Sequence, residues 1–179
     1  MEKHLRTIIA TAVLILALSS TAGAGESETF DVTVSITASA SISVTGGPIN
    51  FGTMGVGSTD VSSSAITVTN DGSGSDQTYS VALVDPSGWT AVTAAPGFDE
   101  YRLSAAFDAD GASITWSPTN HALTTTSTAS SASKFAGDQS GTAVPYNETR
   151  SLYLQLETPS ATASPSAKTI QVSITASVD

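Results

Sequence analysis

Few residues of this sequence could carry out chemistry. The 179-residue chain has no cysteine, which excludes thiol catalysis and cysteine-containing zinc sites. Beyond residue 24 its one histidine is His121, so a serine–histidine–aspartate triad would have to use that side chain. His121 follows Asn120 in a predicted loop, where we expect it to be solvent-exposed. We therefore predict no catalytic residues and a protein that is not an enzyme.

Several carboxylates are close in sequence. Asp99 with Glu100, and Asp108 with Asp110, could supply the acid and base of glycoside hydrolysis, although such pairs occur by chance among 16 acidic side chains. Residues 108–111 (DADG) also look like the start of a calcium loop, but they lack its third ligand and its distal glutamate. We predict no cofactor and ordinary turns, and a weak calcium site at Asp108, Asp110 or the loop 71–76 remains the alternative.

Five aromatic side chains offer a second kind of site. They could stack on sugar rings, but such residues more often close the core of a β-sandwich, and we favour that interpretation. The residues are Trp89, Tyr101, Trp116, Tyr146 and Tyr153.

Composition and the first residues indicate export. With 16 acidic and 6 basic side chains, a net charge of −10 and a pI near 4.3, the chain is not expected to bind nucleic acid. Lys3 and Arg6 precede an apolar run over residues 8–18, and residues 22–24 (AGA) supply a small-residue cleavage site. We predict a signal peptide over 1–24 and a single secreted domain over 25–179. The apolar run is too short for a transmembrane helix, so no membrane span is expected in the mature form.

Apolar and polar residues alternate along most of the mature chain. This two-residue period predicts an all-β protein, an antiparallel Ig-like or pilin-like β-sandwich. The longer predicted strands lie within residues 30–37, 79–83, 101–107, 152–156 and 170–176, and the shorter ones within 41–44, 49–51, 65–69, 89–92 and 114–116. Residues 123–133, rich in Ser, Thr and Ala, predict a long exposed loop. The residues expected to face the core are Phe51, Val81, Leu83, Leu103, Leu154, Val172 and Ile174.

One hexapeptide occurs twice. Residues 34–39 and residues 172–177 both read VSITAS. The repeat follows either from the biased composition or from two strands that occupy equivalent grooves, one of them donated to a neighbouring subunit. The candidate assembly residues in the donor and acceptor strands are Phe30, Val32, Val34, Ile36, Ile170, Val172 and Ile174.

Three short motifs carry a family resemblance. Residues 48–53 (PINFGT), 57–59 (GST) and 66–70 (ITVTN) resemble choice-of-anchor type bacterial surface Ig-like repeats and the secreted pilin-like family that includes spore coat protein U. The strand over 79–83 (YSVAL) and the late strand ending at Pro159 are similar to the same layout. The resemblance implies an Ig-like fold and a role at the cell surface. Pilin-like members often carry cysteines near their first strands, and this chain has none.

These observations favour a structural role. We expect a secreted, non-enzymatic protein of the extracellular space or cell surface, a pilus- or fibre-like subunit that assembles through its edge strands. Its expected partners are copies of itself or other surface-assembly proteins. The alternative is a soluble extracellular module that binds carbohydrate or a protein partner.

The predicted signal peptide can be tested directly. We expect the intact mass of the exported protein to correspond to a chain beginning near Gly25, because the small residues 22–24 follow the apolar run. An extracellular form that retains residues 1–24 would contradict this prediction.

Overall fold

The computed structural model describes residues 33–112 and 114–179, and the chain divides into two units, residues 1–36 and 37–179. In the first unit, residues 33–36 are described and belong to no strand. Val34 is 79% exposed and Ile36 is 86% exposed. The half-buried strand predicted over 30–37 is therefore wrong for its described part, residues 33–37, while Phe30 and Val32 lie outside the described residues.

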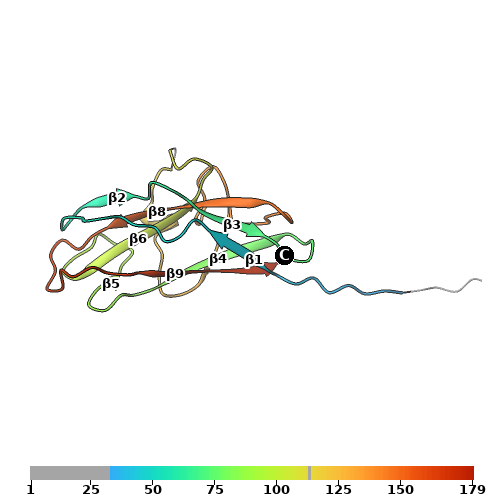
Figure 1. Ribbon diagram of the computed structural model, residues 1–179, viewed down its shortest axis with the longest axis horizontal. Coiled ribbons are helices and arrows are strands. Elements are labelled where there is room, and N and C mark those ends of the chain that lie inside the picture. The colour runs from blue at the N-terminus through green and yellow to red at the C-terminus, as the bar shows by residue number, and fades with distance from the viewer. Residues whose placement is uncertain (1–32, 113) are drawn as a thin grey trace, which may run out of the picture. The chain divides into compact units, whose positions relative to one another are not determined.

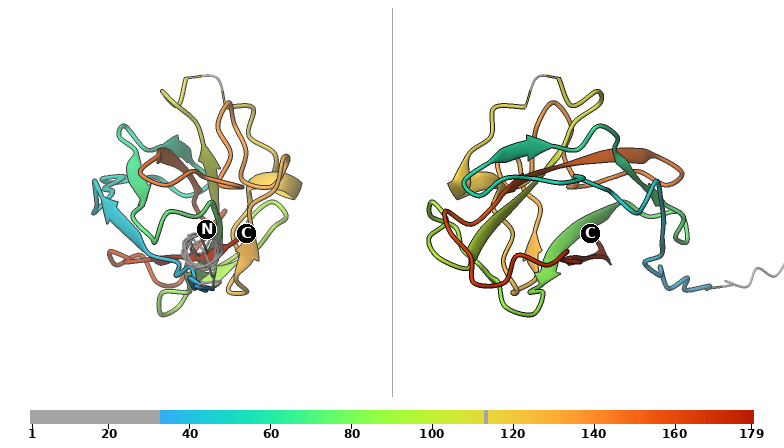
Figure 2. Two further views of the ribbon diagram at one scale, coloured as in Figure 1. Left: turned by 90° about the vertical axis from the view of Figure 1, so that its right-hand side faces the viewer. Right: turned by 60° about the vertical axis from the view of Figure 1, so that its left-hand side comes forward.

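The second unit is a sandwich of two mostly antiparallel sheets, as predicted (Figure 1; Figure 2). One sheet has six strands and is centred on a long strand, β8, which pairs with β6 along one edge. β5 pairs with β6 in parallel, and the other pairings in this sheet are antiparallel. In order, its main path is β1 (Ile42–Thr45), β3 (Ile66–Asn70), β8 (Thr149–Glu157), β6 (Glu100–Phe107) and β5 (Thr90–Ala91), with β2 (Thr59–Val61) beside β8.

The opposite sheet has three strands. Its order is β7 (Thr128–Ala129), β4 (Gln77–Val84) and β9 (Gln171–Val178), so β9 lies at one edge. β4 and β9 are antiparallel along their whole length, with Gln77 opposite Val178 and Val84 opposite Gln171. In Figure 1, β4 and β9 form one layer, and β2, β3 and β8 belong to the other.

The second edge of β8 is shared by two short strands. β3 pairs with the first half of β8 and β2 pairs with its last three residues. Ser62 lies between β2 and β3, where its N–H donates to the Leu154 carbonyl (2.8 Å) and its hydroxyl accepts from the Leu154 N–H (3.1 Å). This buried side chain therefore satisfies the β8 backbone at the point where the ladder changes strands.

The core lies between the two layers and follows the alternation of the sequence. Tyr79, Val81 and Leu83 on β4 belong to the same buried cluster as the apolar residues of β6 and β8. The rings of Tyr79 and Phe107 meet at a centroid distance of 5.9 Å. Of the residues predicted to face the core, four are buried, namely Val81, Leu83, Leu103 and Leu154, and three are half-buried, namely Phe51, Val172 and Ile174.

Several local predictions are wrong. Residues 49–51 and 114–116 form no strands. The loop over 123–133 contains β7, and both Leu123 and Ser130 are buried, so it is only partly exposed. A single helical turn, α2 (Pro118–His121), was not expected, although proline in the first turn of a helix is a typical start signal.

The core assignment predicts that alanine substitutions at two neighbouring positions of β4 lower the free energy of unfolding by different amounts. Leu83 is 2% exposed whereas Val84 is 56% exposed. We expect Leu83→Ala to lower the free energy of unfolding by about 2–5 kcal/mol, and Val84→Ala to lower it by less than about 1 kcal/mol. Denaturant unfolding measures both, and equal effects would contradict the assigned facing of β4.

Candidate functional site

His121 is a structural residue in α2. Contrary to the expectation of a solvated side chain, it is 4% exposed. Its Nδ1 accepts from the Ser117 N–H (3.0 Å), so Nε2 carries the proton and donates to the Ala136 carbonyl (3.1 Å). Because both ring nitrogens are bound to backbone groups, His121 is not placed to take a proton from a serine. The side chain instead joins α2 to the loop around residue 136.

Lys134 is bound to the same helical turn. Its Nζ donates to the carbonyls of Thr119 and Ala122, each at 3.2 Å, and lies 4.7 Å from the centroid of the Phe135 ring. Burial lowers the pKa of Lys134. The ammonium group therefore satisfies carbonyls at the end of α2, which an α-helix leaves without intrahelical partners.

The carboxylate of Asp108, a candidate calcium ligand, accepts hydrogen bonds from backbone N–H groups. Asp108 is fully buried, and its Oδ1 accepts from the Gly111 N–H (2.8 Å) and the Asp110 N–H (3.3 Å), while Oδ2 accepts from the Asp138 N–H (3.1 Å). Burial alone would raise the pKa of Asp108, but these hydrogen bonds outweigh it and hold the pKa below its usual value. Asp108 thus joins two loops, and both of its carboxylate oxygens accept hydrogen bonds from backbone N–H groups.

The other acidic candidates are also tied to loops. Asp99 Oδ1 accepts from the Thr162 hydroxyl (2.6 Å) and the Ala163 N–H (3.0 Å), and Glu100 accepts from the Gly97 N–H (2.8 Å). The turn over 71–76 is organised by the buried Asn70 amide, which donates to the carbonyls of Ser75 and Val144. Within residues 33–112 and 114–179, no three acidic or histidine side chains come together as metal ligands.

The aromatic candidates have different packing partners. Trp89 packs against Tyr101 with ring centroids 6.1 Å apart, and Trp116 packs edge-on against His121 at 5.6 Å. Burial raises the pKa of the Tyr101 hydroxyl, and so does the hydrogen bond that it donates to Asp85 (3.0 Å). Tyr153 is half-buried on β8 and Tyr146 is half-exposed in a turn. Of the five residues, Tyr101 belongs to the buried core and Trp89 packs against it, so the interpretation as core residues holds for these two.

A further candidate site is an apolar groove of about 940 Å³ in the sandwich. Its floor includes Leu152, Leu154 and Leu156, three alternate residues on the inward face of β8, together with Leu103 on β6. Alternate side chains on a strand are about 7 Å apart. The floor is therefore a straight row of apolar side chains with the spacing of a β-strand.

Two different segments form the walls of the groove. One wall is β9 and the residue before it, from which Ile170, Val172 and Ile174 line the groove. These residues are half-buried, whereas the residues between them, including Ser173, are exposed. The other wall is the irregular segment 48–56, which contributes Phe51 and other apolar side chains. Because β9 is an edge strand, its backbone on the groove side has no strand partner in the part of the chain that the structure describes.

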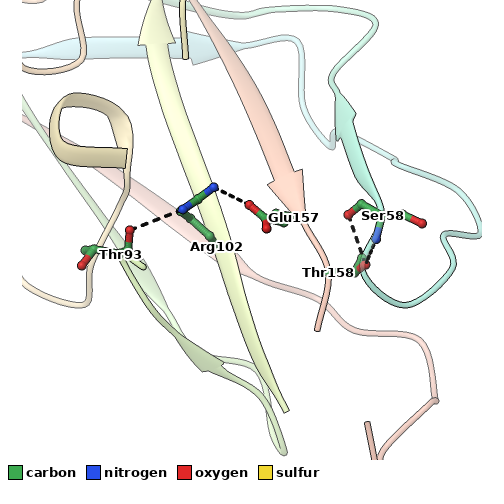
Figure 3. Close-up of polar contacts among 5 residues, drawn as sticks. All are labelled: Ser58, Thr93, Arg102, Glu157 and Thr158. Carbon is green, nitrogen blue, oxygen red and sulfur yellow. Dashed lines mark hydrogen bonds and ion pairs between the residues drawn. The ribbon is translucent and has the colours of Figure 1, made fainter. Parts of the chain in front are cut away.

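The floor strand is fixed at its C-terminal end by polar contacts (Figure 3). Arg102 on β6 forms an ion pair with Glu157 and also donates to the Thr93 carbonyl (3.5 Å). The Thr158 hydroxyl accepts from the Ser58 N–H (2.9 Å), and the Thr158 N–H donates to the Ser58 carbonyl (2.9 Å). These contacts join β8 to β6 and to the segment that leads into β2, so the apolar row has a defined position.

The structure brings together only part of the predicted assembly residues. Ile170, Val172 and Ile174 share one wall of the groove. Val34 and Ile36 are exposed, and Phe30 and Val32 lie outside the described residues. Sequence reasoning identified Leu154 and Phe51 only as core residues and missed that both line an open groove. The period of two predicts that a side chain faces inward but not whether another strand covers it.

The chain has no match among known protein families, curated proteins or solved structures. Among the described residues, no helix is long and apolar enough to cross a membrane.

The contacts of Asp108 predict a change in acid stability. We expect Asp108→Asn to lower the free energy of unfolding at pH 7 by about 1–3 kcal/mol, because the amide NH₂ replaces a buried oxygen that accepts a backbone N–H. A carboxyl with a lowered folded-state pKa contributes stability above its unfolded pKa of about 3.9 and loses that contribution as the pH falls through the folded value. Denaturant unfolding between pH 7 and pH 2 should therefore show a steeper loss for the wild type than for Asp108→Asn. Parallel pH profiles would contradict the structural role of this carboxylate.

Proposed function

We propose that the protein is an exported, non-enzymatic structural subunit that assembles into a fibre or pilus at the cell surface. In this assembly, residues 25–38 of one copy fill the apolar groove of the next copy. The observation that carries the proposal is the groove itself, in which core leucines of β8 lie beside an edge of β9 that pairs with no strand of the described residues.

The periodicity of the N-terminal segment fits the floor of the groove. Residues 30, 32, 34 and 36 are Phe, Val, Val and Ile, and polar residues alternate with them. An extended segment presents such residues on one face about 7 Å apart, which is the spacing of the leucine row on β8. Val34 and Ile36 are both strongly exposed here. Their burial in the groove would remove apolar surface from water, which is favourable by about 25 cal/mol per Å².

The edge of β9 offers backbone pairing in addition. An incoming strand that pairs with β9 extends the three-stranded sheet and satisfies N–H and C=O groups that the edge leaves unpaired. The wall opposite β9, residues 48–56, is irregular and contributes side chains instead. A donated strand is therefore expected to gain a hydrogen-bond ladder on one side and apolar contacts on the other.

Matched substitutions in the full chain test the donor segment. We expect the wild type and Ser35→Asp to form fibres as the concentration rises, and Ile36→Asp to remain monomeric, because position 36 shares the apolar face and position 35 does not. Both substitutions add the same charge. Light scattering and electron microscopy measure the outcome.

A complementary substitution tests the groove. Ile174→Asp in β9 should also yield monomers, with Thr175→Asp on the exposed face as its control. Mixing Ile36→Asp with Ile174→Asp chains should then give one-to-one dimers, because each pair retains one intact donor and one intact groove. Circular dichroism checks that both variants fold. A wild type that stays monomeric at every concentration would contradict the proposal, and sugar binding on a glycan array would then favour the carbohydrate-binding alternative.

A further inference from the structure

The residues at the two ends of β9 differ in charge. Lys168 is the single charged side chain among the described residues that line it, and it lies two residues before Ile170, at the start of β9. At the other end of β9, the Asp179 N–H donates to the Asp76 carbonyl (3.1 Å), so two acidic residues lie close together there. β9 is therefore preceded by a basic residue that lines the groove and followed by acidic residues that are not part of the groove lining.

The ammonium group of Lys168 has a fixed place but no anionic partner among residues 33–112 and 114–179. Its Nζ donates to the Ser87 carbonyl (2.7 Å) and the Ser164 hydroxyl (2.6 Å), and lies 5.7 Å from the centroid of the Trp89 ring. Both ion pairs of the described residues involve other cations, Arg102 and Arg150. The positive charge of Lys168 is thus held at the groove without a carboxylate of the described chain to neutralise it.

The N-terminal segment also has unequal ends. Glu26, Glu28 and Asp31 are concentrated at its beginning, and residues 32–59 contain no charged side chain. Glu28 has the same parity as residues 30, 32, 34 and 36, so in an extended strand its side chain would lie on the apolar face, at its edge.

We propose, on the basis of the fibre function above, that residues 25–38 of a second copy enter the groove parallel to β9, with Glu28 paired to Lys168. Phe30 follows Glu28 by two residues, as Ile170 follows Lys168. The pairing therefore sets the apolar face of the donor beside the apolar face of β9. An antiparallel strand in the same groove would carry the acidic end of the segment toward Asp76 and Asp179, where like charges repel.

Peptide binding to a monomeric acceptor tests the direction. The acceptor is the full chain carrying Ile36→Asp, and the probe is a fluorescent peptide of residues 25–41. The control peptide carries Glu28→Ser and Ala40→Glu, which moves one acid to the opposite end and keeps the net charge and the apolar residues 30–36. We expect the natural peptide to bind roughly two- to fivefold more tightly at low salt, and this ratio to shrink toward one in 1 M salt. Tighter binding of the control peptide would overturn the parallel direction.

Charge reversal tests the residue pair. Lys168→Glu in the acceptor should weaken binding of the natural peptide, and a peptide carrying Glu28→Lys should restore it. Lys168→Gln serves as a milder variant if Lys168→Glu does not fold. Equal affinities for all combinations would overturn the Glu28–Lys168 pairing and leave the fibre function in place. Failure of every peptide to bind, together with a monomeric wild type, would overturn the fibre function as well.

Discussion

The main constraint on this structure is that the apolar side chains on the inward face of β8 must be kept from water. Leu152, Leu154 and Leu156 form a continuous apolar row in a six-stranded sheet, and the sheet opposite has three strands. β4 packs into the core, whereas β9 at the edge is only half-buried. This row, whose leucines are at most 8% exposed, forms the floor of a groove bordered by β9 and by the segment 48–56. The core is thus covered by buried residues of β4, and by half-buried residues where β9 and the segment 48–56 border the groove.

Buried polar side chains hold the loops of this cysteine-free chain. Three of them bind backbone groups of segments distant in sequence, namely Asn70, Asp108 and His121. Ser62 binds the backbone of β8 at the point where the ladder changes strands. Such contacts satisfy N–H and C=O groups that would otherwise be buried without partners. Residues that looked like candidates for catalysis or metal binding thereby contribute to stability, because a buried polar group without a hydrogen-bond partner destabilises the fold.

Four of the five strands with a sustained period of two could be predicted from the sequence, whereas the described part of the fifth, residues 33–37, forms no strand. Those within 79–83, 101–107, 152–156 and 170–176 are confirmed, because alternation reports directly which side chains face the core. The same alternation wrongly predicted a strand over 49–51. The backbone there is irregular, and its apolar side chains line the groove. The burial of His121 could not be predicted, because one of its partners, Ala136, is fifteen residues away. The groove itself depends on how β8, β9 and the segment 48–56 come together, which no local pattern describes.

Hydrogen–deuterium exchange over a range of concentrations tests the central claim most directly. If another copy fills the groove, amides in residues 30–38 and in β9 should become protected together as the protein assembles, while amides in the middle of β4 stay equally protected throughout. Slower exchange confined to the donor segment and β9 is the predicted result. Exchange of both segments that does not change from dilute to concentrated solution would contradict the account.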